Sequence, residues 1–165
     1  MKKFKITGEV KVLESGVVLH RIMALRDIMT IPNVGKVKSG SLGGWIEREG
    51  NLAKDGEAWV AEEACVYGDA RVTGMALVAG RARVSGHARV GGAALVSGDA
   101  TVTDHARVAG KARVTGNARV DMVARVSGSA RLFGVAREPG APRFGERRSA
   151  NGIAGRWHKE STLRK

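Results

Sequence analysis

The chain has little of what usually builds a globular core. Its 165 residues include only 3 Phe, 3 Trp and 1 Tyr, so a core of large aromatic side chains is excluded. A core has to be assembled from small aliphatic side chains, repeated many times. The single cysteine, Cys65, excludes an intrachain disulfide and favours a reducing compartment.

Long apolar runs and acidic residues are also scarce. No stretch approaches the ~18 apolar residues of a membrane span, and the first residues, "MKKFKITGEVKVL", carry charges without the apolar segment of a signal peptide. We therefore expect a soluble, cytoplasmic protein with no membrane partner. Asp and Glu total 16 against 28 Lys and Arg, which leaves a net charge of +12. This excess predicts an anionic partner: nucleic acid, a nucleotide or an acidic protein.

A six-residue repeat fills the middle of the chain. Val or Leu returns at every sixth position from 60 to 132, with Ala two residues before it and usually Gly two residues after it. Six is not a multiple of 3.6, so an α-helix would scatter the Val residues around its circumference. A strand places Ala and Val on one side and the intervening residue on the other. Because Gly permits a corner, each hexad predicts a short strand plus a turn, and successive coils stack.

The repeat divides the chain into three zones. Residues 1–57 are not repetitive; "FKITGEVKVL" and "VVLHRIMAL" predict a β-hairpin cap, and "IPNVGKVKSGSLGG" predicts a loop. Residues 58–137 form the predicted solenoid. Residues 138–165 begin where Glu138 and Pro139 break the pattern, and form either a basic tail or a lid that uses Phe144, Ile153 and Trp157.

The hexads resemble those of the hexapeptide-repeat, left-handed parallel β-helix proteins. "VSGHAR" shows the pattern, with an aliphatic residue at Val84, Gly86 two residues later and the small Ala88 four residues later. The resemblance implies an all-β, single-stranded solenoid in which three hexads make a triangular coil of eighteen residues. It also implies the left hand, whereas the general rule for parallel crossovers favours the right.

The N-terminal zone adds a second resemblance. The segments "LHRIMALRD", "LGGWIEREGNL" and "EAWV" are similar to the opening of phage- and prophage-associated hexapeptide-repeat proteins, which are often labelled putative transferases. This resemblance implies a phage or prophage origin and the cytoplasm of a bacterial host cell.

An eighteen-residue coil sorts the outward residues into columns with steps of ~4.8 Å. One column holds only arginine, beside small residues and next to a corner where two histidines stack. Its guanidinium groups could receive phosphates or carboxylates; alternatively, duplication copied a long, solubilising residue. The candidate anion-binding residues are Arg71, Arg89, Arg107, Arg125, His87 and His105.

A second outward column begins with apolar residues at its N-terminal end. Such a patch usually marks a contact, here either a subunit interface or a packing site for the N-terminal zone. The hexapeptide resemblance implies a homo-oligomer, with a trimer favoured. The candidate interface residues are Trp59, Met75, Leu77 and Leu95.

Three functions remain open, and enzymatic activity is uncertain. The first is a non-enzymatic phage-type scaffold that captures an anionic ligand or partner, interferes with a host system and needs no cofactor. The second, implied by the resemblance, is an acyltransferase that uses acyl-coenzyme A, with His87 or His105 as the base; no segment leaves the coil to shape an acceptor pocket. The third is a structural spacer in a virion or another assembly. Two histidines without a third ligand make a poor zinc site, so no metal is expected.

Overall fold

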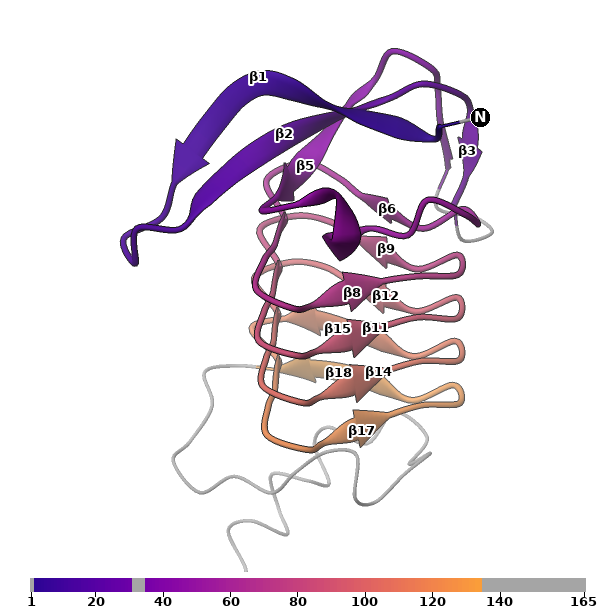
Figure 1. Ribbon diagram of the computed structural model, residues 1–165. Helices are drawn as coiled ribbons and strands as arrows, with labels where there is room; N and C mark the ends of the chain where they lie inside the picture. Colours follow the sequence, from indigo (N-terminus) through magenta and orange to yellow (C-terminus); the bar gives the residue numbers. More distant parts are fainter. Residues whose placement is uncertain (1, 31–34, 135–165) are drawn as a thin grey trace, which may run out of the picture.

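The computed structural model describes residues 2–30 and 35–134, and the predicted tail or lid at 138–165 lies outside this part. The repeat folds into stacked coils beneath an N-terminal β-hairpin (Figure 1). The hairpin is the antiparallel pair β1 (Phe4–Val12) and β2 (Val18–Ala24), as predicted. A second small pair, β3 (Ile28–Met29) and β4 (Lys36–Val37), extends into the segment predicted as loop.

Three sheets form the walls of the solenoid. The first continues the hairpin through β5 (Leu42–Ile46), β7 (Cys65–Val66), β10 (Arg83–Val84), β13 (Thr101–Val102) and β16 (Arg119–Val120). The second contains β8 (Arg71–Val72), β11 (Arg89–Val90), β14 (Arg107–Val108) and β17 (Arg125–Val126). The third contains β6 (Trp59–Val60), β9 (Leu77–Val78), β12 (Leu95–Val96), β15 (Arg113–Gly116) and β18 (Arg131–Gly134).

The register confirms the predicted coil. Arg83 pairs in parallel with Cys65 on one side and Thr101 on the other, so residues 18 apart in sequence lie side by side in neighbouring coils. The parallel β-solenoid is thereby established, and its left hand stays a prediction. The Ala and Val of each hexad face inward and are buried, which gives one continuous core of small aliphatic side chains.

Glycine at the corners is required by both conformation and space. Gly92 has φ +62°, a left-handed conformation that side chains with a Cβ disfavour. A Cβ built on Gly92 would lie 2.7 Å from the backbone nitrogen of Gly110. Three other corners in the described residues nevertheless carry side chains: Glu62 (φ 56°), Asp104 (φ 59°) and Met122 (φ 57°). Asp104 uses its side chain, because its Oδ2 accepts a hydrogen bond from the Met122 N–H at 3.0 Å.

The solenoid begins earlier than the repeat. β5 pairs in parallel with β7, matching Ile46 to Val66, and Leu52 bridges to Val72. This first coil is irregular and includes a 3₁₀ turn, η1 (Glu49–Asn51). Stacked pairing therefore starts at Trp45, inside the zone assigned from sequence to the cap.

The N-terminal region covers two of the residues expected to be exposed. Trp59 and Leu77 are 1 % and 5 % exposed, because they belong to a buried cluster that includes Phe4 and Ile22. They are not exposed as the outward column predicted, and their burial agrees with the packing site for the N-terminal zone, one of the two uses that the sequence left open. Met75 is 38 % exposed and Leu95 is half-buried, so a subunit interface on this face, which stays a prediction, has only these two of the four residues available.

Cys65 is also buried. It packs with Leu19 of β2 and Trp45 of β5, and this burial raises the pKa of its thiol. None of the elements in the described ranges is a helix with the length and apolarity that a membrane crossing requires.

Candidate anion-binding face

The four arginines of the second sheet form a ladder on one wall. Arg89 pairs in register with Arg71 and Arg107, and Arg107 pairs with Arg125. All four side chains are exposed, because each precedes a buried Val and points to the other side of its strand. Neighbouring strands are ~4.8 Å apart, so the guanidinium groups emerge in a single row. We call Arg71, Arg89, Arg107 and Arg125 the arginine ladder.

The described part of the chain provides no counterion for the ladder. Some arginines elsewhere pair with carboxylates: Arg26 with Glu57 at 2.8 Å, and Arg81 with Asp99 at 2.9 Å. Within residues 2–30 and 35–134, no ion pair or hydrogen bond joins a ladder side chain to an acceptor. The positive charge of the ladder is therefore not neutralised by the described residues.

Small residues run beside the ladder. The outward position after each Val on this wall is Thr73, Gly91, Ala109 and Ser127. Three of these residues are exposed and Gly91 is half-buried, and none has a side chain long enough to overhang the strands. The wall therefore consists of a row of arginines beside a row of small residues, as the sequence predicted. We call the row of Thr73, Gly91, Ala109 and Ser127 the floor of the ladder.

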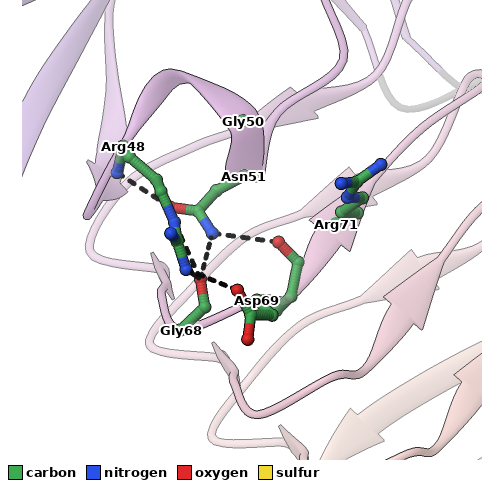
Figure 2. A pocket seen from close by; sticks show the side chains of 7 residues that line it. Arg48, Gly50, Asn51, Gly68, Asp69 and Arg71 are labelled. Carbon is green, nitrogen blue, oxygen red and sulfur yellow. Dashed lines mark hydrogen bonds and ion pairs between the residues drawn. The ribbon is translucent and has the colours of Figure 1, made fainter.

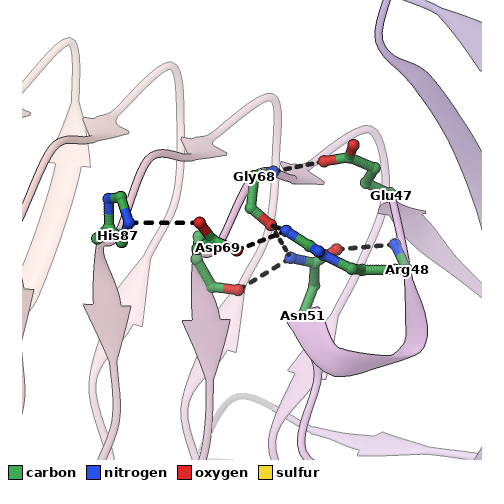
Figure 3. A network of polar contacts seen from close by, with 7 residues as sticks. Glu47, Arg48, Asn51, Gly68, Asp69 and His87 are labelled. Carbon is green, nitrogen blue, oxygen red and sulfur yellow. Dashed lines mark hydrogen bonds and ion pairs between the residues drawn. The ribbon is translucent and has the colours of Figure 1, made fainter.

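The two predicted histidines stack at the adjoining corner. The rings of His87 and His105 are parallel within 4°, with centroids 4.8 Å apart. Asp69, one coil above, places its Oδ2 3.3 Å from His87 Nε2 and its Oδ1 2.7 Å from the guanidinium of Arg48. Figure 3 shows this row from Arg48 through Asp69 to His87. His87 is thus brought together with a carboxylate, the partner that a base or a cationic imidazolium requires.

A shallow pocket lies at the N-terminal end of the ladder (Figure 2). Arg48, Asn51, Gly68, Asp69 and Arg71 are among its lining residues. Asn51 is buried and ties η1 to the next coil, since its amide donates hydrogen bonds to the carbonyl oxygens of Gly68 and Ala70 at 3.0 and 2.9 Å. Arg71 stands apart from this network across the pocket. The sequence analysis did not predict Arg48 and Asn51 as site residues. They lie in the irregular first coil, where the hexad pattern is absent and cannot be used to place side chains.

The other walls carry interrupted charge. The outward column of the first sheet alternates Cys65, Arg83, Thr101 and Arg119, and Arg119 pairs with Asp121 at 3.3 Å. The third sheet has two consecutive arginines, Arg113 and Arg131. Across the described part of the chain, no three His, Cys, Asp or Glu side chains are grouped to hold a metal ion.

Comparison with known proteins agrees with the repeat. Residues 82–98 match the model of the YdcK beta solenoid repeat. The chain is 31 % identical over 84 residues to a protein of Escherichia coli (strain K12) named "Uncharacterized acetyltransferase YdcK", which covers 45 % of this chain and 25 % of that protein. The chain thus spans about a quarter of the length of this curated relative. The match and the eighteen-residue register together support a parallel β-solenoid built from hexapeptide-like repeats.

Proposed function

We propose that this chain is an anion-binding β-solenoid and that its arginine ladder binds phosphate or carboxylate groups. The observation that carries the proposal is the ladder itself: four arginines in register, exposed, and without a carboxylate partner among the described residues. Each guanidinium has a planar fork of donors that matches a carboxylate or a phosphate. A backbone held by β-pairing fixes the spacing of the forks before the ligand arrives.

The origin, partner and assembly of the protein are proposed from the sequence resemblances alone. The N-terminal zone resembles phage- and prophage-associated proteins, so we propose a phage or prophage origin and interference with a host system through capture of an acidic partner in the cytoplasm. The hexads resemble those of hexapeptide-repeat proteins, so we propose a homotrimer. The proposed anion binding does not depend on the origin or on the trimer, because each chain carries all four arginines.

The proposal is tested by anion binding to matched double variants. Arg89→Ser with Arg107→Ser removes the middle of the ladder, whereas Arg113→Ser with Arg131→Ser removes two arginines that are also adjacent, exposed and in register, but on another wall. We expect a fluorescent polyanion to bind the wild type and the second variant alike and the first variant at least about tenfold more weakly. Equal binding by all three proteins would contradict the proposal.

Acyl transfer is a second candidate, favoured by two observations. The relative with a matching segment is named an acetyltransferase, and His87 lies against Asp69, as a general base with an orienting carboxylate does. In this alternative the ladder holds the phosphates of acyl-coenzyme A. Heat stabilisation by acetyl-coenzyme A that is lost in Arg89→Ser with Arg107→Ser, together with release of free coenzyme A from acetyl-coenzyme A that is lost in His87→Ala, would support it. Acetyl-coenzyme A without effect on the unfolding temperature, or release of coenzyme A that survives His87→Ala together with His105→Ala, would refute it.

A further inference from the structure

We infer that the ligand of the arginine ladder is a linear inorganic polyphosphate that lies parallel to the solenoid axis. The inference rests on the proposed function and adds the shape, direction and chemical class of the ligand. It is drawn from the width of the ladder, the floor beside it, its spacing and the side chains that this wall lacks.

The ladder is one arginine wide and runs along the axis. Arg89 has an arginine above and below it, but the next outward residue on its own strand is the half-buried Gly91. Binding sites for negative charge therefore repeat in one direction only. A single linear chain that follows the axis can meet all four guanidinium groups, whereas a compact anion meets one or two.

The floor favours a chain without side groups. It is made by Thr73, Gly91, Ala109 and Ser127, and within the described residues this wall offers no Phe, Tyr or Trp on which a base could stack. The rings of His87 and His105 at the adjoining corner stack on each other. Single-stranded nucleic acids gain much of their affinity from such stacking. A polyphosphate has neither bases nor sugars, so the lack of stacking partners on this wall does not lower its affinity.

The spacing also fits a polyphosphate. Consecutive phosphates share a bridging oxygen and lie closer together than the ~4.8 Å between neighbouring arginines, so every second phosphate of a gently coiled chain can face one guanidinium. Four arginines then span about seven phosphates. Neighbouring phosphates of a nucleic acid strand are separated by a sugar and lie farther apart than neighbouring arginines of the ladder, so such a strand loses register with the ladder within a few steps.

The N-terminal end of the track is closed. Arg48 is occupied by Asp69 and by the carbonyl oxygen of Gly68, and the 3₁₀ turn η1 lies above Arg71 (Figure 2). Because Arg48 and Asp69 pair with each other at 2.7 Å, Arg48 does not extend the positive charge of the ladder upward. The bound chain is therefore expected to end near Arg71 and to extend toward Arg125.

The test is a titration of the full chain with sodium polyphosphates of defined length, at constant ionic strength. We expect the affinity per molecule to rise at least about tenfold from tripolyphosphate to a chain of about seven phosphates, and then to level off. Arg89→Ser with Arg107→Ser should abolish the length dependence, and Arg113→Ser with Arg131→Ser should preserve it. Oligothymidylate of matched charge serves as the competing polymer.

Each outcome decides between the inference and the proposal beneath it. If oligothymidylate binds as tightly as polyphosphate and both depend on Arg89 and Arg107, the polyphosphate assignment falls and the anion-binding face stands. Affinity that rises without levelling, or that both double variants lower equally, refutes the ladder as a track. If no polyanion binds at low salt, the inference and the proposed function fall together.

Discussion

The arginine ladder should cost the fold stability, and the chain contains its own control for measuring that cost. Arg89 lies between Arg71 and Arg107, whereas Arg83 lies between Cys65 and Thr101. Both arginines are exposed, precede a buried Val and carry no ion pair among the described residues. Replacing each by Thr, the residue found naturally at position 101, removes the same stem and charge. Only Arg89→Thr also removes the repulsion from two like-charged neighbours.

The expected difference follows from Coulomb's law. Two unit charges about 5 Å apart repel by about 0.8 kcal/mol in water, and flexible side chains reduce this by moving apart. With two neighbours, Arg89→Thr should raise the free energy of unfolding by about 1 kcal/mol more than Arg83→Thr does at low salt. At about 1 M salt the Debye length falls to ~3 Å, and the difference should vanish.

Urea unfolding of both variants at low and high salt measures this difference. A free energy gap between Arg89→Thr and Arg83→Thr that closes with salt supports adjacent, uncompensated guanidinium groups. No gap at low salt, or a gap that salt leaves unchanged, would refute the reasoning, because neighbouring charges in water must repel and must be screened.

Three further changes test other parts of the structure. Met122→Gly should raise the free energy of unfolding by about 0.5–1 kcal/mol in a denaturant titration, because Met122 holds φ at 57°, which glycine adopts without strain; a loss of stability would contradict this. Lys3 is buried and its Nζ donates to the carbonyl oxygen of Ala58 at 2.9 Å, and burial lowers its pKa from 10.5 to about 8. The unfolded chain therefore binds more protons between these values, so stability should rise by about 3 kcal/mol as pH increases from about 8 to about 10.5, and Lys3→Met should lack the rise. The Cys65 thiol, buried beneath β2 with a raised pKa, should react with a disulfide reagent at pH 8 far more slowly than in the urea-unfolded chain; equal rates would show that the hairpin does not cover it.

The repeat allowed the solenoid and the ladder to be predicted from sequence because its period alone determines the stacking. Once three hexads close a coil, Arg71 and Arg89 must be neighbours, whatever the rest of the chain does. Such a period contains no information about which other segment covers a wall. Trp59 and Leu77 occupy outward positions and would be exposed in a bare solenoid, but the N-terminal region packs over them.

The first coil was missed for a related physical reason. Its strand β5 contains Gly43 and Gly44, whose positions leave no space for a Cβ: one on Gly43 would lie 2.6 Å from a Trp59 side-chain carbon, and one on Gly44 would lie 2.6 Å from the carbonyl oxygen of Ala64. This close approach joins the cap to the repeat. In the sequence, however, "LGGWI" follows a Gly- and Ser-rich stretch and reads as loop, and Arg48 and Asn51 stand outside the hexad register.

The central claim is that the four arginines of the ladder bind one polyanion together. The salt dependence of polyanion affinity measures the number of arginines that bind. For four contacts, the logarithm of the association constant of polyphosphate should fall with the logarithm of salt concentration with a slope of about −3. The slope should be about −1.5 in Arg89→Ser with Arg107→Ser and unchanged in Arg113→Ser with Arg131→Ser. One common slope for all three proteins, or an equal reduction in both double variants, would contradict a ladder that acts as a single site.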